Sequence, residues 1–425
     1  MTRRACLPEL REAVEAIFKP APRSDRDPGA LGVELELIPL RDGSHGMLEQ
    51  LPIDEVLPFV RSCCARLAPR EASGPKPLIE LAGGGRITFE PGGQLEYSGP
   101  ACPTAEAAGR DLREVMGRLR RAGKAEEIYL ADRGIVDPAS AVPLDLQLSH
   151  IRYRALEARF KKVGPWGRVM MCRTASMQLN LDFGPASGAI ERLQLCHLLV
   201  PVLGGAFANS PLVLPDGSRA ASGRLWIWRR TDPTRSGFVL PRYGESPVDA
   251  YFRFALGAPV VLYRKGRDYA PGDGRPFAEW LDDEECDGPT PDDWAVHLTT
   301  LFPHVRPRGW LELRFIDTPR EEWWDVPIVV VAALIYDPVA RRRATELLAP
   351  LAQRLEEVTE AAALRGVSDP EIGDRAEALL ELAIRATERM PGYFGATQVS
   401  AAEEFLSGVT ARRRTQADED LRPGG

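Results

Sequence analysis

The sequence predicts an α+β fold in which an antiparallel sheet is surrounded by helices. Strand patterns, with apolar residues at every second position, are spread over the first three quarters of the 425 residues. From about residue 320 onward the pattern is largely helical. Strands and helices that are segregated in this way are typical of α+β proteins. We expect one domain over 1–425, with a core at about 30–320, a helical part at about 321–410 and a loose charged tail at 411–425.

The expected elements follow in order along the chain. Helical patterns lie at 8–18, 53–68, 103–121, 188–208 and 294–301, and strand patterns lie at 31–38, 86–98, 170–183 and 309–317. Residues 251–264 hold a helix and then a strand, whereas 19–30 and 211–250 read as loops. Pro103 and Thr104 mark a helix start. Asn209-Ser210-Pro211 ends the helix before it, because a residue that precedes proline disfavours helical geometry.

Composition and charge exclude several classes of protein. The chain is 44% hydrophobic and 27% charged, with a formal net charge of −7, so nothing global attracts it to nucleic acid or to a membrane surface. No apolar run reaches membrane-spanning length and the N-terminus lacks an apolar signal core, so we expect a cytoplasmic protein. The seven cysteines are scattered and form no CxxC pair, which argues against a disulfide framework or a structural zinc site.

Four of the expected strands carry an apolar face and a second face of acids, amides and hydroxyls. Side chains on a strand alternate between its faces, so the spacing assigns them directly. The polar-face residues are Glu34 and Glu36; Glu90, Gln94 and Glu96; Thr174, Ser176, Gln178, Asn180 and Asp182; and Glu312 and Arg314. Their spacing predicts that one face of the sheet is strongly acidic.

Five mid-strand carboxylates without a lysine among them need a compensating cation. Hard divalent cations prefer carboxylate oxygens, and Mg²⁺ is commonly shared between carboxylates and nucleotide phosphates. We therefore favour a site for a metal and a nucleotide over the alternative, an ordinary sheet with one solvated face. The chain lacks a GxxxxGK loop and a GxGxxG motif, so a nucleotide would be held by metal and arginine instead.

Arginines stand in the connections near the acidic strands. They occur at 152–154, 224–235 and 306–308, where bidentate recognition of carboxylate or phosphate and a plain surface position are both open. His297 and His304 are interpreted as core or surface residues. Cys172 is interpreted as a small buried hydrophobe and not as a nucleophile, because no base lies near it in the sequence.

The same stretches resemble a known family. They are GVELE at 32–36, FEPGGQLEYSG at 89–99, RYRALE at 152–157, MMCRTASMQLNLDF at 170–183, RLWIWRRTDPTRSG at 224–237 and HLTTLFPHVRPRGWLELRFID at 297–317. In this order they resemble the plant and proteobacterial type of glutamate–cysteine ligase, and more closely the actinobacterial ligase that feeds ergothioneine synthesis. The resemblance covers about residues 30–320.

The resemblance implies a glutamine-synthetase-like catalytic fold, ATP and Mg²⁺ as cofactors, and L-glutamate and L-cysteine as substrates. It implies that ATP converts the glutamate γ-carboxylate to an acyl phosphate, which the cysteine amine attacks. The implied metal ligands are Glu34, Glu36, Glu90, Glu96 and Glu312. The implied catalytic residues are Glu90, Arg235 and Arg314. The implied ATP or phosphate ligands are Gln178, Asn180 and Arg314. The implied substrate-binding residues are Arg152, Met170, Met171, Arg173, Thr174, Trp228 and Arg235.

Two other functions stay open at this point. One is a ligase of the same fold that acts on a different amine or acid. The other is a non-catalytic relative that binds an amino acid or a nucleotide. The oligomeric state and the thiol pathway that uses the product cannot be read from the sequence.

Overall fold

The long strand β1 (Leu31–Asp42) is the axis of the fold. The computed structural model describes residues 4–20, 24, 27–43, 47–67, 69–72, 76–137, 141–142, 144–265, 268–283 and 288–418. Within these residues, eleven strands form one sheet, and eight of them follow the order β14-β15-β9-β1-β6-β5-β4-β3. The other three extend the C-terminal half of β1, where β2 and β7 pair with β1 and β8 pairs with β2. Every pairing in this sheet is antiparallel except that of β2 with β8.

The remaining strands are short. They are β2 (Leu48–Gln50), β3 (Arg70–Ala72), β4 (Leu78–Glu80), β5 (Arg86–Phe89), β6 (Leu95–Ser98), β7 (Tyr129–Ala131), β8 (Ala141–Val142), β9 (Ser176–Leu181), β14 (Val305–Pro307) and β15 (Leu311–Asp317). Two small hairpins lie apart from the sheet, β10 (Leu212–Val213) with β11 (Arg219–Ala220) and β12 (Leu262–Lys265) with β13 (Asp268–Pro271).

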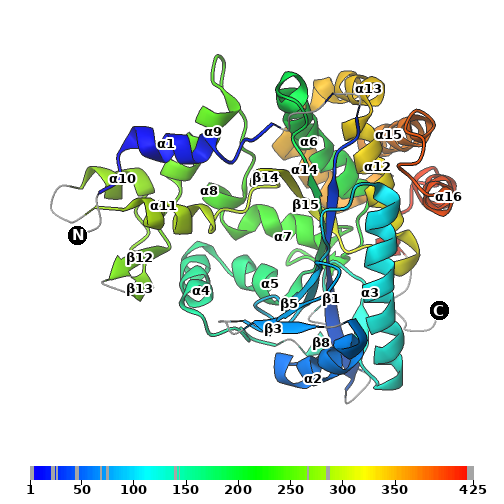
Figure 1. Ribbon diagram of the computed structural model, residues 1–425, viewed down its shortest axis with the longest axis horizontal. Coiled ribbons are helices and arrows are strands. Elements are labelled where there is room, and N and C mark those ends of the chain that lie inside the picture. The colour runs from blue at the N-terminus through cyan, green and yellow to red at the C-terminus, as the bar shows by residue number, and fades with distance from the viewer. Residues whose placement is uncertain are drawn as a thin grey trace.

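Helices flank the sheet on both sides (Figure 1). On the right of that view lie α3 (Ala105–Ala125), α12 (Asp325–Tyr336), α13 (Pro338–Leu348), α15 (Pro370–Thr387) and α16 (Ala396–Phe405). Behind the upper part of the sheet, near the centre, lie α6 (Ala186–Ala206) and α14 (Leu355–Arg365). On the left lie α1 (Leu7–Glu15), α4 (Ile151–Val163), α9 (Pro247–Gly257), α10 (Phe277–Asp282) and α11 (Pro291–Leu298). The others are α2 (Ile53–Cys64), α5 (Trp166–Arg173), α7 (Gly223–Thr231) and α8 (Pro233–Ser236).

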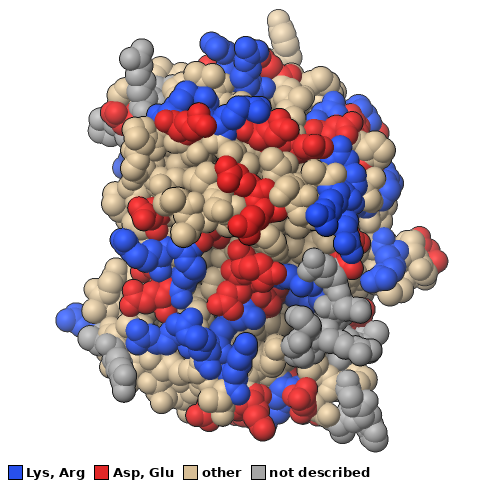
Figure 2. All heavy atoms as spheres, turned by 90° about the vertical axis from the view of Figure 1, so that its right-hand side faces the viewer, with Lys and Arg blue, Asp and Glu red and all other residues tan. Residues whose placement is uncertain are grey.

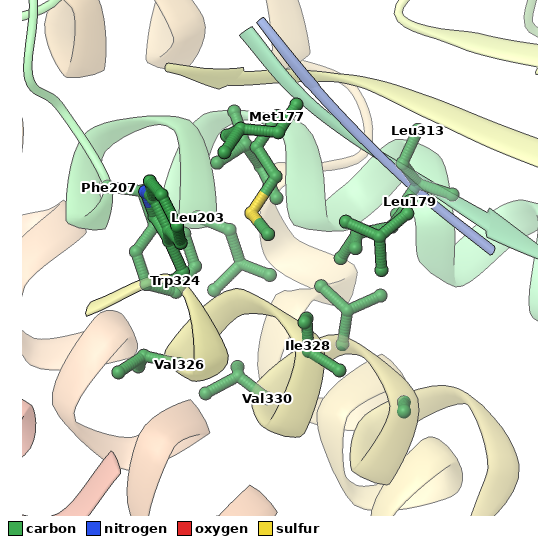
Figure 3. Close-up of a cluster of buried hydrophobic side chains, with 14 of the residues drawn as sticks. Met177, Leu179, Leu203, Phe207, Leu313, Trp324, Val326, Ile328 and Val330 are labelled. Carbon is green, nitrogen blue, oxygen red and sulfur yellow. The ribbon is translucent and has the colours of Figure 1, made fainter. Parts of the chain in front are cut away.

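The apolar face of the sheet packs against α6 and α12. Met177 and Leu179 of β9 and Leu313 of β15 face Leu203 and Ile328 in this layer (Figure 3). All twelve residues of α12 are buried, as expected of a helix that is apolar on every side. One hydrophobic cluster runs from Leu31 to Val409, so the helical C-terminal part shares the core of the sheet. The opposite, polar face is thereby left to line a site.

The structure confirms the antiparallel sheet and the helical C-terminal part, and corrects three local predictions. The expected strand 170–183 begins only at Ser176, because the apolar run before it forms the helix α5 and packs Met171 into a cluster with Phe160. The expected strand 86–98 is a hairpin, broken at a turn where Gly93 has φ 92°. Its two halves still present their polar residues to one face.

The third correction concerns the expected loop 211–250, which contains α7 and α8. The Ser222 hydroxyl accepts a hydrogen bond from the Leu225 amide at 3.1 Å, and the Asp232 carboxylate accepts one from the Thr234 amide at 3.2 Å. These are N-caps, which start helices in an otherwise aromatic and basic stretch. In the predicted tail, Thr415, Gln416 and Ala417 are buried, and Gln416 accepts a hydrogen bond from the Arg320 amide, so this part of the tail is packed on the protein. Residues 419–425 lie outside the described residues.

The exposed face formed by the helices on the right of Figure 1 mixes acidic and basic side chains (Figure 2). Within the described residues, no single helix is long and apolar enough to cross a membrane. The pair Glu321–Tyr336 and Pro338–Leu351 passes that test only jointly, across a bend of 96°.

Candidate active site

A cavity of about 1180 Å³ lies over the polar face of the sheet. The sheet forms one wall, and α4, α5, α7 and α11 supply residues to the other. All five glutamates singled out by the strand pattern line this cavity: Glu34, Glu36, Glu90, Glu96 and Glu312. The alternation of polar and apolar residues therefore assigned these side chains to the correct face.

The strand register brings the polar residues together. Glu36 of β1 is paired with Glu96 of β6, and Glu34 is paired with Gln178 of β9. On the other side of β9, Asn180 is paired with Glu312 of β15. Directly opposed residues of antiparallel strands have Cα atoms about 4.5–5.5 Å apart. Side chains as long as glutamate can therefore reach a common point from neighbouring strands.

Glu34, Glu36, Glu90 and Glu96, which we name the acidic floor, have few cationic partners. Glu36 accepts hydrogen bonds from the Ser176 amide at 2.7 Å and from the Gln178 amide group at 3.0 Å. Glu34 accepts one from Asn180, and Glu96 accepts one from Thr88 and one from Ser98. The ammonium group of Lys76 lies 3.7 Å from Glu90. Neutral amides and hydroxyls thus hold most of this negative charge in place.

Burial raises the pKa of three of these carboxyls, and the charge of Glu96 adds to the effect. The pKa of Glu34 rises to about 7, that of Glu90 rises to about 8, and that of Glu36 rises as well. Carboxyls that resist ionisation near neutral pH mark a place where negative charge is not neutralised by the protein itself. Such a place favours a bound cation.

Glu312 has the opposite surroundings. Its two oxygens accept hydrogen bonds from Arg306, Arg308 and Arg314, which we name the arginine cluster. Burial opposes ionisation of Glu312, but the charges of Arg306 and Arg314 outweigh burial and hold its pKa well below the usual range. Arg314 also donates to the Gln178 side-chain oxygen at 2.6 Å. This carboxylate is neutralised by the chain's own cations.

The donor set of the acidic floor suits a hard divalent cation, because every side-chain donor is a carboxylate oxygen. In the described part of the chain, no three His, Cys, Asp or Glu side chains already converge at the spacing of a metal site. The fit therefore depends on the donor chemistry, on the paired strand positions and on the unneutralised charge. Rotation of the glutamate side chains would bring their oxygens together.

Most of the predicted substrate and phosphate residues reach the cavity. These are Arg152, Met170, Met171, Thr174, Gln178, Asn180, Trp228 and Arg314. The Trp228 ring has the Arg224 guanidinium 5.1 Å and the Arg314 guanidinium 5.6 Å from its centroid. Within the described residues, Nε of Arg152, Nε of Arg314 and Nε1 of Trp228 are buried donors without a hydrogen-bond acceptor. Three lone donors in one cavity suit an anionic or carbonyl-bearing ligand.

Two predicted residues are not brought to the cavity. Among the described residues, Arg173 and Arg235 are absent from its lining. Arg235 is fully buried and donates from Nε to Asp232 at 3.0 Å and from Nη1 to the Thr300 carbonyl at 2.9 Å. Its Nη2 donates to the Pro259 carbonyl. Direct contact of Arg235 with a substrate does not agree with this geometry, because its donors are already used inside the protein.

The sequence left Arg224 open between a binding role and a surface position; it lines the cavity and is only 2% exposed. It donates to the Arg314 carbonyl at 2.6 Å and lies 3.8 Å from Asp317. Its spacing from Trp228 could have decided for the cavity, since residues four apart share one face of a helix. Arg306 was left open in the same way, and it is paired with Glu312 across the hairpin of β14 and β15.

His297, His304 and Cys172 are confirmed as core residues. His297 bonds through Nε2 to the Ala255 carbonyl at 2.8 Å, and burial lowers the pKa of both histidines to about 3. Cys172 is 2% exposed in α5, and burial raises its thiol pKa to about 11. These groups are therefore neutral near pH 7 and are not poised for catalysis.

Comparison with known proteins adds a family to this geometry. Residues 30–397 match glutamate–cysteine ligase family 2. The chain is 35% identical over 344 residues to the glutamate–cysteine ligase EgtA of Mycolicibacterium smegmatis, which covers 80% of this chain and 78% of the relative. It is 29% identical over 340 residues to the chloroplastic glutamate–cysteine ligase of Medicago truncatula, covering 77% of this chain and 66% of the relative.

Among solved structures, the chain is similar to the complex between the prokaryotic ubiquitin-like protein Pup and its ligase PafA. The TM-score is 0.39 at 10% sequence identity, and the match covers 91% of this chain and 65% of that chain.

Proposed function

The chain belongs to glutamate–cysteine ligase family 2, and we propose on this premise that its cavity joins glutamate to cysteine with ATP, giving γ-glutamylcysteine. The observation that carries the proposal is the acidic floor. It puts carboxylates with few cationic partners in one cavity with arginines and lone donors. That combination suits a nucleotide with its metal on one side and amino-acid substrates on the other.

The proposed reaction has two steps. An oxygen of the glutamate γ-carboxylate attacks the γ-phosphorus of ATP, the bond to the β-phosphate oxygen breaks, and ADP leaves. The nitrogen of cysteine then attacks the carbonyl carbon of the acyl phosphate, inorganic phosphate leaves, and the amine proton passes to solvent. A free carboxylate is a poor electrophile, so the first step is needed. The protein mainly positions the reactants and balances their charge.

We propose that Glu34, Glu36, Glu90 and Glu96 hold Mg²⁺. When bound, Mg²⁺ supplies positive charge to the phosphate oxygens of the nucleotide. The side chains of Gln178 and Asn180 bond to Glu36 and Glu34 and so fix the direction of these carboxylates. Hydrogen bonds of this kind orient carboxylates that hold a metal, and rotation of the glutamate side chains would complete the site.

Glu312 was predicted to belong to the metal ligands and lies on the same wall of the cavity. Because arginines already occupy both of its oxygens, we propose that Glu312 mainly fixes Arg306 and Arg314. Arg314 would then face the transferring phosphoryl group. An arginine held by a buried carboxylate keeps its other donors in a set direction.

We propose that the amino acids bind at the end of the cavity formed by α4, α5 and α7. Arg152 and Arg224 supply guanidinium groups for carboxylates, and Trp228 supplies a buried N–H donor. Met170 and Met171 supply polarisable, apolar surface, which suits the side chain of cysteine. Arg235 supports this end indirectly, through Asp232 and the residues that follow α7.

The test is an amino-acid panel assayed for ADP release with ATP and Mg²⁺, with the product identified by mass. We expect cysteine-stimulated ADP release that requires glutamate, together with the mass of γ-glutamylcysteine. Product formed only with another amine would support a ligase of different specificity. ATP binding without turnover for any pair of substrates would support a non-catalytic relative.

We also propose that the product serves the synthesis of a low-molecular-weight thiol such as ergothioneine, and that the reaction takes place in the cytoplasm. Deletion of the gene in its own host, followed by measurement of thiols and fractionation of the native protein, tests both points. An unchanged thiol pool would contradict the first, and recovery of the protein outside the cytoplasmic fraction would contradict the second.

A further inference from the structure

The two ends of the cavity differ in chemistry. The end near Glu36 carries the arginines, methionines and Trp228 described above. The lining of the opposite end includes Ala13, Ile17, Ala30, Gly32 and Ala101, which are small or apolar, together with the indole of Trp310 and the guanidinium of Arg308. A second tryptophan, Trp294, lines the cavity beside α1. None of the roles proposed for catalysis, metal or amino-acid binding uses this opposite end.

Trp310 lines this end of the cavity and is 39% exposed, so part of a large apolar side chain is open to solvent. A tight turn places it there, because Gly309 has φ 84° and its amide donates to the Ile17 carbonyl at 2.7 Å. The indole nitrogen donates to the Asn180 side-chain oxygen at 2.9 Å. The Arg308 guanidinium lies 5.4 Å from the ring centroid. The ring is thus fixed in place while part of its surface stays open.

The floor beside this ring is flat. Gly32 occupies the strand position that continues the series of Glu36 and Glu34 along β1, and it is paired with Asn180. A Cβ atom at Gly32 would lie 3.3 Å from Cβ of Asn180. Across the strand, Ala101 adds only a methyl group to the lining. The cavity therefore reaches the backbone of β1 at Gly32, beside the Asn180 side chain to which the indole bonds.

The spacing along β1 suits a nucleotide. Glu36 and Gly32 are four residues apart, which is about 13 Å on a strand. Glu36, which is proposed to hold the metal, thus lies about 13 Å along β1 from Gly32, the position beside the Trp310 indole. A triphosphate placed over Glu36 and Glu34 would leave its base over Gly32.

We infer that this end of the cavity binds the adenine base of ATP, stacked on the indole ring of Trp310 above Gly32. The inference rests on the proposed function, since ATP is the substrate it names. Stacking on an aromatic side chain accepts any base because every base has a π-face. Trp310 therefore contributes affinity for the base, and the acidic floor and arginines contribute affinity for the phosphates.

The test compares ATP with inorganic tripolyphosphate, which has the phosphates but no base, each titrated at fixed free Mg²⁺ in a calorimeter. Trp310→Ala should weaken binding of ATP on the order of tenfold or more, because stacking of one base has that effect. It should leave binding of tripolyphosphate unchanged. Trp310→Phe keeps an aromatic face but loses the hydrogen bond to Asn180, and it should keep most of the affinity for ATP.

The outcomes separate this inference from the proposed function. Failure of the parent protein to bind ATP would overturn both. Binding of ATP by the parent and equally tight binding by Trp310→Ala would overturn the inference alone. If Trp310→Phe lost as much affinity as Trp310→Ala, the hydrogen bond to Asn180 and not stacking would be responsible, and the inference would again fail. An equal loss of tripolyphosphate affinity would show that the ring acts on the phosphate site.

Discussion

The acidic floor and Glu312 both present glutamate carboxyls on the same face of one sheet, but the pKa of these carboxyls is shifted in opposite directions. In the acidic floor, burial and neighbouring carboxylates raise the pKa of Glu34, Glu36 and Glu90. Two strands away from β1, the arginine cluster holds the pKa of Glu312 low. The negative charge of the acidic floor is therefore left for a bound cation, whereas the charge of Glu312 is neutralised by arginines of the same chain.

This difference separates function from stability. Buried charges without partners destabilise a fold, so their presence in a cavity indicates a binding role that offsets the destabilisation when the ligand is present. A buried carboxylate that bonds to three arginines gives no such indication, because removing it would leave the arginines unpaired. Substitution of the two kinds of glutamate should therefore have effects of different character.

The largest expected effect is on activity in the acidic floor. Glu36→Gln and Glu90→Gln should each lower kcat about a thousandfold, since charge stabilisation by a metal contributes several kcal/mol. Neither should lower the melting temperature of the metal-free protein, because an amide removes repulsion and desolvation. Glu388→Gln, at an exposed position, is the matched control and should behave as the parent does. A Glu90→Gln enzyme that turned over normally would show that Glu90 is an ordinary solvated glutamate.

At Glu312 the expected loss is one of stability. Glu312→Gln leaves the half-buried Arg306 and Arg314 without their buried counter-charge, so the free energy of unfolding should fall by about 3–5 kcal/mol. Urea unfolding of the metal-free proteins measures this directly, beside Glu90→Gln. Equal stability of the Glu312 and Glu90 variants would remove the distinction between the two groups.

Arg235 tests whether a buried arginine outside the cavity acts on the fold or on the substrate. Lysine cannot donate to Asp232, Thr300 and Pro259 together, so Arg235→Lys should lower the free energy of unfolding by about 1–3 kcal/mol. The KM values of the remaining folded enzyme should stay near those of the parent. A raised KM for glutamate at unchanged stability would return Arg235 to the substrate site.

The dependence of stability on pH should also differ between the two groups. The folded pKa values of Glu34, about 7, and of Glu90, about 8, exceed the unfolded value, so the folded state binds more protons. The stability that these protons contribute is complete below the unfolded pKa and is lost as the pH rises through the folded values. The melting temperature in chelator should therefore fall from pH 7 to pH 8.5, a range above the unfolded pKa of histidine.

Glu90→Gln should flatten this slope, because the amide does not titrate. A melting temperature that rose between pH 7 and pH 8.5 in the metal-free parent would contradict the raised pKa values. A slope that was the same in the parent and in Glu90→Gln would assign the dependence to other groups.

The smallest expected effect is at Cys172. Its thiol is buried in α5 and protonated near neutral pH, and the proposed reaction needs no nucleophile from the protein. Cys172→Ala should keep most of the activity and lower stability by about 1 kcal/mol through lost packing. A folded but inactive Cys172→Ala protein, with a thioester trapped in the parent by mass spectrometry, would contradict the two-step reaction.

Alternation along the strands was enough to predict the acidic wall of the cavity. Glu34, Glu36, Gln178, Asn180 and Glu312 lie where a period of two assigns them, because a strand with one apolar face has no other stable orientation. This part of the site is local in origin, since it follows from each segment separately.

The partners of the arginines could not be predicted in the same way. Arg235 and Arg314 each have an acidic residue two or three positions earlier in the sequence, Asp232 and Glu312. Arg235 is nevertheless enclosed by Asp232, Thr300 and Pro259, whereas Arg314 faces the cavity. The helix α5 was mistaken for a strand, because a short apolar run fits either period and its packing against α4 and α7 decides. These features depend on contacts between distant segments, which no local pattern contains.

The most direct test of the central claim is a titration of Mn²⁺, as a spectroscopic substitute for Mg²⁺, followed by electron paramagnetic resonance at pH 8 with and without ATP. The parent protein should bind Mn²⁺ more tightly with ATP than without it. Glu36→Gln and Glu90→Gln should each bind Mn²⁺ at least about tenfold more weakly than the parent, because loss of a group that supports a metal lowers its affinity by about this factor. Equal affinity of the parent and both variants for Mn²⁺ would contradict the assignment of the acidic floor as the cation site.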